Sequence, residues 1–251
     1  MTYCVALKLD EGLVCLSDTR TNAGIDNVSR YKKTFTWEGP DRAICLMSAG
    51  NLSITQGVID QLETAVAVGD DPDADATHAT VMNVPTLFRL AEIVGAKMHA
   101  LIEQHAAAME KDGASSGASI IVAGQIAGEP PRLFLVYSAG NFIECGSDTP
   151  YFQIGEAKYG KPVIDYTVRH DTDLTDGVRT ALVSMASTVR SNLSVAAPLD
   201  LSVIRADEHR FALRRRINED DSLWRAIAEG WPEAMEEALH RLPSVEGWLS
   251  A

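Results

Sequence analysis

Apolar residues recur with two different periods along this chain, and the period changes in blocks. Short apolar runs and alternation are typical of β-strands, whereas spacings of three and four are typical of helices. The first strand pattern covers residues 2–9, 13–20, 30–37 and 43–48, and helical spacing follows at 52–68 and 84–111. A second block has strands at 118–126, 132–138, 141–145 and 151–154 and helices at 158–168 and 174–192. Strands at 199–205 and 210–216 and a helical segment from residue 220 complete the chain.

The first two predicted strands flank Asp10-Glu11-Gly12, a combination typical of a tight hairpin. Both faces of this hairpin are apolar, so both need cover, as in the middle of a layered structure. Two antiparallel strand blocks, each followed by a pair of helices, predict one α+β domain. We expect four layers, α/β/β/α, in which two antiparallel sheets stack face to face and helices cover the outer faces.

The hairpin also relates two polar residues in space. If Leu9 pairs with Leu13, Thr2 faces Arg20, and Thr2 and Asp18 become diagonal neighbours on one face. A bulge in the turn would shift this register by one residue. An aspartate in such a covered position is costly unless it has a partner, so Asp18 is a candidate for a paired, functional acid.

Charge and composition exclude several classes of protein. The net charge of −13 and the pI near 4.8 argue against a nucleic acid or an anionic membrane as partner. No apolar run reaches about 18 residues, and the start shows no secretory pattern, so we expect a cytoplasmic protein with no membrane segment. The cysteines lie in strand-like runs, which favours buried, reduced thiols, and no metal-ligand spacing occurs, so we expect neither a metal nor a cofactor. These cysteines are Cys4, Cys15, Cys45 and Cys145.

Thr2 stands at the start of the first predicted strand. If Met1 is removed, Thr2 carries both a hydroxyl group and a free α-amine, and the amine can activate the hydroxyl as a nucleophile. An α-amine has a reference pKa of about 7.7–8.0, so part of it is an unprotonated base near neutral pH. A threonine at position 2 is common by itself, so this hypothesis depends on the rest of the chain.

Several motifs follow Thr2 in order: Asp18-Thr-Arg-x-x-x-Gly24, Lys33 in the next strand, and Ser48-Ala-Gly-Asn51 before a helix. Ile154-Gly155-Glu156, Ser191-Asn-Leu-Ser194 and the strand from Asp200 to Ile204 continue the set. Over residues 2–206 the chain resembles the β-type subunits of proteasomes, and within them the bacterial proteasome-like group called Anbu. The resemblance implies the N-terminal-nucleophile hydrolase fold and a homo-oligomer that forms a ring, a helix or a lock-washer.

The resemblance also implies roles for individual residues. Thr2 matches the nucleophile, Asp18 the buried acid and Lys33 the catalytic lysine, although the adjacent Lys32 stays an alternative. Gly50 matches the glycine that binds the oxyanion. The positions with an implied supporting role are Arg20, Ser191 and Ser194. Ser191 stands where the family usually has an aspartate, which weakens the expected support for the terminal amine.

Together these features predict a threonine-type peptidase or amide hydrolase that acts on a peptide or another amide. Two alternatives stay open: a catalytically weak or silent assembly protein, and an amidase for small molecules. We expect the sandwich to span residues 1–212 and a helical extension to span 213–251. The large apolar residues of that end pack either on their own domain or on a neighbouring subunit; they are Trp224, Trp231, Leu239 and Trp248.

Overall fold

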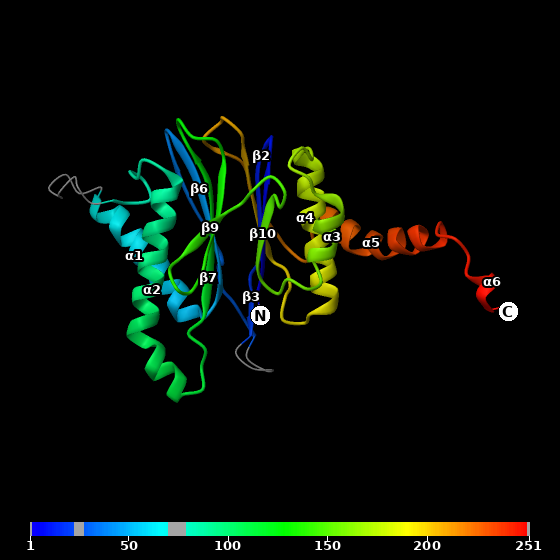
Figure 1. Ribbon diagram of the computed structural model, residues 1–251, viewed down its shortest axis with the longest axis horizontal. Coiled ribbons are helices and arrows are strands. Elements are labelled where there is room, and N and C mark those ends of the chain that lie inside the picture. Colours follow the sequence, from blue (N-terminus) through cyan, green and yellow to red (C-terminus); the bar gives the residue numbers. More distant parts are fainter. Residues whose placement is uncertain (1, 23–27, 70–78, 250–251) are drawn as a thin grey trace.

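The computed structural model describes residues 2–22, 28–69 and 79–249, so Met1 and Gly24 lie outside the described residues. Two five-stranded antiparallel sheets stack between two pairs of helices, as Figure 1 shows. The predicted α+β, four-layer α/β/β/α arrangement is therefore confirmed. No described helix has both the length and the apolar character needed to cross a membrane.

The first sheet has the strand order β10-β1-β2-β11-β12. Its strands, in chain order, are β1 (Tyr3–Leu9), β2 (Gly12–Asp18), β10 (Tyr151–Gly155), β11 (Leu199–Arg205) and β12 (Phe211–Ile217). Helices α3 (Lys161–Thr167) and α4 (Leu174–Ser191) cover its outer face. A core built from β1, β2, α3 and α4 joins these two layers.

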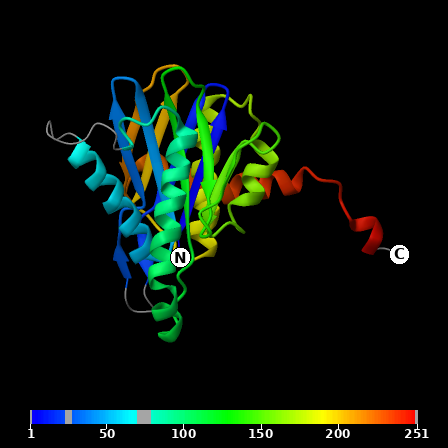
Figure 2. The ribbon, with the colours of Figure 1, turned by 60° about the vertical axis from the view of Figure 1, so that its left-hand side comes forward.

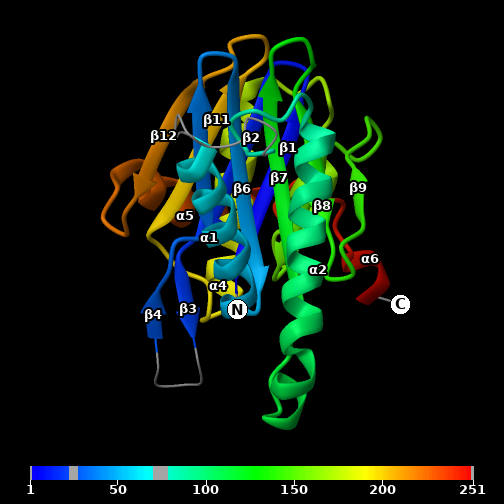
Figure 3. The same ribbon diagram turned by 90° about the vertical axis from the view of Figure 1, so that its left-hand side faces the viewer.

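The second sheet has the strand order β5-β6-β7-β8-β9. Its strands are β5 (Thr34–Gly39), β6 (Arg42–Gly50), β7 (Ala118–Ile126), β8 (Arg132–Val136) and β9 (Phe142–Glu144). Helices α1 (Leu52–Gly69) and α2 (Leu87–Lys111) lie on its outer face, which Figure 3 turns toward the viewer. A short hairpin of β3 (Arg20–Asn22) and β4 (Val28–Arg30) extends below both sheets in that view.

The β1–β2 register differs by one residue from the predicted one. Leu9 pairs with Gly12, and Cys4 pairs with Ser17, because the turn consists of Asp10 and Glu11 alone. A one-residue shift moves every side chain of one strand to the other face. Gly12 also lies against the neighbouring strand, where a Cβ would come within 2.1 Å of the Ile204 carbonyl oxygen.

This register places small and sulfur-containing side chains between the sheets. Cys4 and Ala6 from β1 and Cys15 from β2 meet Ala43 and Cys45 from β6 in the central core. Small residues allow the two sheets to approach closely. One face of the hairpin packs against the second sheet and the other against α3 and α4, which explains why both faces are apolar. All four cysteines are buried, free thiols, as predicted.

Two predicted strands are interrupted. β2 ends at Asp18 and β3 begins at Arg20, while the predicted strand 30–37 is divided into β4 and β5. Lys33 therefore lies between two strands, just before β5, and not inside a strand. The interruptions place both Asp18 and Lys33 at one end of the stacked sheets.

The C-terminal end starts inside the sandwich and then leaves it. The expected boundary between residues 212 and 213 falls within β12, which pairs with β11 up to Ile217. Helix α5 (Ser222–His240) follows and continues through Pro232, and α6 (Glu246–Leu249) comes last. Trp224 is the buried residue of α5, and Figure 2 shows α6 far from both sheets.

Candidate active site

Asp18 is the centre of a buried ion pair at the end of β2. Its side chain is fully buried, and its Oδ1 atom lies 2.7 Å from Lys33 Nζ. The same oxygen accepts a hydrogen bond from the Tyr3 backbone N–H at 3.0 Å. The other carboxyl oxygen, Oδ2, is buried and has no hydrogen-bond partner among the described residues. One oxygen therefore connects the lysine to the residue that directly follows Thr2.

Lys33, and not Lys32, is the lysine that points inward. Its side chain is only 4% exposed, and its Nζ also donates to the Arg20 carbonyl oxygen at 2.5 Å. Lys32 is exposed, and its Nζ lies 5.0 Å from the centre of the Phe35 ring. The exposed position of Lys32 therefore leaves Lys33 as the lysine that pairs with Asp18.

Burial raises the pKa of the Asp18 carboxyl group above its ordinary value, while the charge and hydrogen bond of Lys33 act in the opposite direction. Removing a carboxylate from water costs free energy that only a well-placed partner offsets. The Lys33 ammonium group and the Tyr3 N–H are these partners.

A backbone hydrogen bond to the residue that follows β10 holds Thr2. Its carbonyl oxygen accepts a hydrogen bond from the Glu156 N–H at 2.7 Å. Gly155, the residue before Glu156, has a φ of +84°, and a Cβ on Gly155 would lie 2.0 Å from the Thr2 carbonyl oxygen. Only glycine allows this close approach. Thr2 is thus fixed between the β2 end, through Tyr3, and the β10 end.

Gly50 lies at the exposed end of β6, directly before α1. Its φ of +101° favours glycine, and a Cβ would meet the Gly117 carbonyl oxygen at 2.3 Å. Asn51 caps the helix, since its Oδ1 accepts from the N–H groups of Ser53 and Ile54 at 3.0 and 3.2 Å. A backbone amide at such a strand-to-helix turn is suited to bind an oxyanion.

β6 is also connected to the two other strands of the site. The Ser48 N–H donates to the Lys33 carbonyl oxygen at 3.0 Å, and the Cys4 thiol lies 3.7 Å from the Ser48 carbonyl oxygen. The Lys33 segment and the β6 end are therefore neighbours, and the start of β1 lies across from them.

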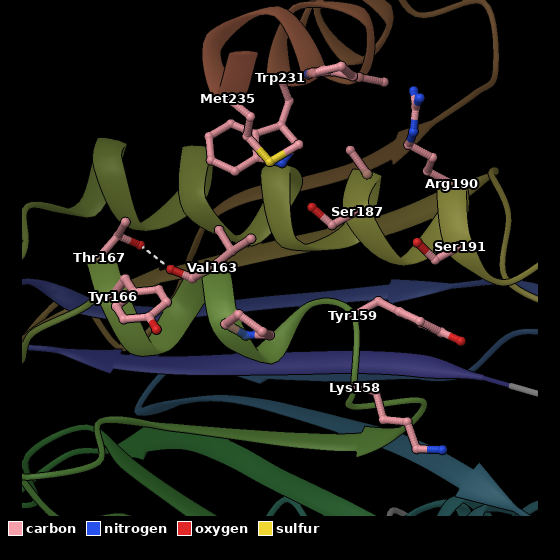
Figure 4. Close-up of a pocket in the computed structure, with 14 residues that line it drawn as sticks. Lys158, Tyr159, Val163, Tyr166, Thr167, Ser187, Arg190, Ser191, Trp231 and Met235 are labelled. Carbon is pink, nitrogen blue, oxygen red and sulfur yellow. Dashed lines mark hydrogen bonds between the residues drawn. The ribbon is translucent and has the colours of Figure 1, made fainter. Parts of the chain in front are cut away.

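Arg20, Ser191 and Ser194, the residues with a predicted supporting role, have different surroundings. Arg20 contributes its carbonyl oxygen to Lys33, while its half-buried side chain has an Nε atom without a partner among the described residues. The Ser194 N–H donates to Asn192 Oδ1 at 2.9 Å. Ser191 is exposed and lines a cavity beside α5, together with Arg190 (Figure 4). The structure thus directs Ser191 away from the ion pair.

The structure adds a buried pair to which sequence reasoning assigned no role. Asn192 Nδ2 donates to Glu156 Oε2 at 2.9 Å, and Glu156 Oε1 accepts from the Lys158 N–H at 3.1 Å. Both side chains are buried. Since Glu156 holds the Thr2 carbonyl oxygen, this pair connects the end of α4 to Thr2. Both residues stood within the quoted motifs, but their pairing requires the fold.

Comparison with solved structures finds similar chains that are described as Anbu. Anbu (ancestral beta-subunit) from Yersinia bercovieri is 38% identical, with a TM-score of 0.87 over 97% of this chain and 98% of that chain. The structure described as the helical assembly of the Anbu complex from Pseudomonas aeruginosa is 39% identical, with a TM-score of 0.87 over 96% and 97%. An Anbu (Gly-1) mutant from Hyphomicrobium sp. strain MC1 is 40% identical, with a TM-score of 0.86 over 97% and 99%.

No protein-family model and no curated protein matches the chain. The solved relatives nevertheless cover nearly all of this chain, and the N-terminal-nucleophile hydrolase fold predicted from the sequence is confirmed. On identity and coverage of this extent, the chain belongs to the Anbu family of bacterial proteasome-like proteins.

Proposed function

We propose that this protein is a threonine-type amide hydrolase, in the first place a peptidase, whose nucleophile is Thr2 after removal of Met1. The observation that carries the proposal is the buried ion pair between Lys33 and Asp18, whose shared oxygen also holds the Tyr3 N–H. A buried lysine–aspartate pair is costly to desolvate, and such pairs cluster at functional sites. This pair therefore contacts the residue that directly follows Thr2.

The proposed reaction uses four groups. The free α-amine of Thr2 accepts the hydroxyl proton, and Oγ attacks the substrate carbonyl carbon. Lys33 contributes positive potential that favours the deprotonated oxygen, and Asp18 holds Lys33 in place. The Gly50 amide stabilises the tetrahedral oxyanion. The C–N bond then breaks, the leaving amine takes the proton, and water hydrolyses the acyl ester and regenerates Thr2.

We further propose that the protein acts as a homo-oligomer in the cytoplasm. The Pseudomonas aeruginosa relative is described as a helical assembly, and the identity of 39% extends over nearly the whole of both chains. Four buried free thiols are consistent with a reducing compartment.

The test is the intact mass of the purified protein after exposure to a threonine-directed epoxyketone. Loss of Met1 and gain of one adduct are expected for the wild type. Lys33→Ala should abolish the adduct, whereas the adjacent, exposed Lys32→Ala should retain it. Equal adduct formation in both variants would contradict the assignment of Lys33.

The same measurement separates the alternatives. Retained Met1 without an adduct would favour a scaffold protein that kept the fold, a function that the outward position of Ser191 also favours. An adduct on Thr2 combined with turnover of small amides but not of peptides would identify an amidase.

A further inference from the structure

A cavity of about 600 Å³ lies between α3, α4 and α5, on the outer side of the first sheet (Figure 4). Trp231 and Met235 from α5 form one wall, and Val163 and Tyr166 from α3 lie opposite. Tyr166 is 83% exposed and Met235 is 45% exposed. An open cavity with such apolar walls is typical of an interaction site.

The cavity carries positive charge at one end. Lys158 and Arg190 line it at the end away from Tyr166 (Figure 4). Aromatic, methionine and arginine side chains are enriched in protein interfaces. An apolar segment with an acidic residue is the complementary partner.

Such a segment is present at the other end of α5. We use the term C-terminal arm for residues 239–249. Its apolar side chains are exposed, with Trp248 and Leu249 each at 84%. The other exposed apolar residues of the arm are Leu239, Leu242 and Val245. Glu246 supplies an acidic group two residues before Trp248.

The arm points away from the cavity of its own chain. α5 lies over α4 at its start and then leads outward, so that α6 lies farther from the sheets than the other helices (Figures 1 and 2). Within the part of the chain that the structure describes, the arm and the cavity are therefore separate, unsatisfied apolar surfaces. A second copy can satisfy both.

We propose that the C-terminal arm of one copy docks into the α3–α4–α5 cavity of the next copy, with Trp248 in the cavity and Glu246 toward Lys158 and Arg190. The inference rests on the proposed self-assembly and names its contact. Because arm and cavity are different surfaces, each copy offers one of each. Such a head-to-tail contact propagates into a ring if the rotation closes and into a helix if it does not.

Cross-linking between two differently tagged copies tests the docking. One copy carries Leu249→Cys, which retains Trp248, and the other carries Tyr166→Cys at the cavity wall. The natural cysteines are all buried, so a short bis-maleimide should react at the introduced thiols. A cross-linked product that contains both tags is expected. Phe88→Cys on α2, in the opposite helical layer, serves as the control and should give only background product.

Three results would overturn the proposal: no product, a product no greater than that with Phe88→Cys, or, in the doubly substituted chain, a product within one copy only. A second measurement, sedimentation, does not depend on the introduced thiols. Trp248→Ala should weaken self-association by about 30-fold, as expected for an interface hot spot. Leu223→Ala, an exposed leucine at the other end of α5, should not change it, and an unchanged Trp248→Ala would exclude the arm as anchor.

Epoxyketone labelling of the same samples separates this inference from the proposed function. Adduct formation on Thr2 without cross-linking would reject the arm contact alone. Cross-linking without an adduct would reject the threonine hydrolase and retain the contact.

Discussion

Asp18 shows how a single residue combines structural and chemical tasks. Its Oδ1 accepts from Lys33 and from Tyr3, and burial raises its pKa. A raised carboxyl pKa means that the folded state binds the proton more tightly than the unfolded state. The corresponding stability is fully present below the ordinary value of 3.8 and is lost as the pH rises through the higher folded value.

We expect Asp18→Asn and Asp18→Ala to differ in stability. Asparagine retains an acceptor for both donors and has no carboxylate to desolvate, whereas alanine leaves the Lys33 ammonium group buried with only the Arg20 carbonyl oxygen as partner and should cost about 3–5 kcal/mol. Urea unfolding measures the free energy. The wild type should lose stability relative to Asp18→Asn as the pH rises above 3.8. A gain in the stability of the wild type relative to Asp18→Asn would show that the effect of Lys33 on the Asp18 pKa outweighs the effect of burial.

Gly155 is expected to control the position of Thr2. Gly155→Ala should suffer both the strain of a positive φ, about 1–2 kcal/mol, and a clash with the Thr2 carbonyl oxygen. Gly128→Ala is the matched control, because its φ is +90° and nothing lies within 4 Å of the added Cβ. The rate of adduct formation on Thr2 should fall in the first variant only. Equal rates would mean that Thr2 tolerates displacement.

At the scale of elements, an ion pair joins the last two strands of the second sheet, β8 and β9. Arg132 of β8 donates to both carboxyl oxygens of Glu144 on β9 at 2.8 Å, and also to Glu129 at 3.0 Å. The hydrogen bond from Arg132 lowers the pKa of Glu144. A lowered carboxyl pKa gives stability that is present above the ordinary value and is lost as the pH falls through the folded value.

A double-mutant cycle with Arg132→Met and Glu144→Gln should therefore give a coupling free energy that depends on pH. Because Glu144 is partly exposed, we expect only about 0.5–1 kcal/mol at neutral pH. The coupling should vanish in acid, below the lowered pKa of Glu144. The more exposed pair of Arg89 and Glu92 should give less, and a coupling of the same size at all pH values would contradict the role of ionisation.

At the scale of the whole molecule, apolar docking must act against a large charge. Each copy carries a net charge of −13, so copies repel each other at low ionic strength. Salt screens this repulsion, because the Debye length falls from about 30 Å at 0.01 M to about 10 Å at 0.1 M. An interface based on Trp248 and Leu249 depends far less on salt.

We therefore expect self-association to become tighter as the salt concentration rises from about 0.01 to 0.1 M, because salt screens the repulsion between the negatively charged copies. Sedimentation over this series measures the effect, with the Trp248→Ala variant as the control whose self-association stays weaker than that of the wild type at each salt concentration. Dissociation on adding salt would show instead that ion pairs to Lys158 and Arg190 dominate the contact.

The sequence by itself determined the layers and singled out most of the residues of the candidate site. Hydrophobic period depends on local geometry, so it predicted β7 and β11 at their observed bounds and α1 and α4 to within one residue. The motif order selected Thr2, Asp18 and Gly50 as candidate site residues. These features need no knowledge of which strands become neighbours.

Only the tertiary structure decided what depends on register and on distant partners. The two-residue turn of Asp10 and Glu11 sets the register of β1 against β2, and the approach of Ile204 from β11 requires glycine at position 12. The choice between Lys32 and Lys33, the outward position of Ser191 and the pairing of Glu156 with Asn192 likewise follow from which segments meet. Packing decides in which direction a side chain points and which residues far along the chain it contacts, and the local hydrophobic pattern does not predict either.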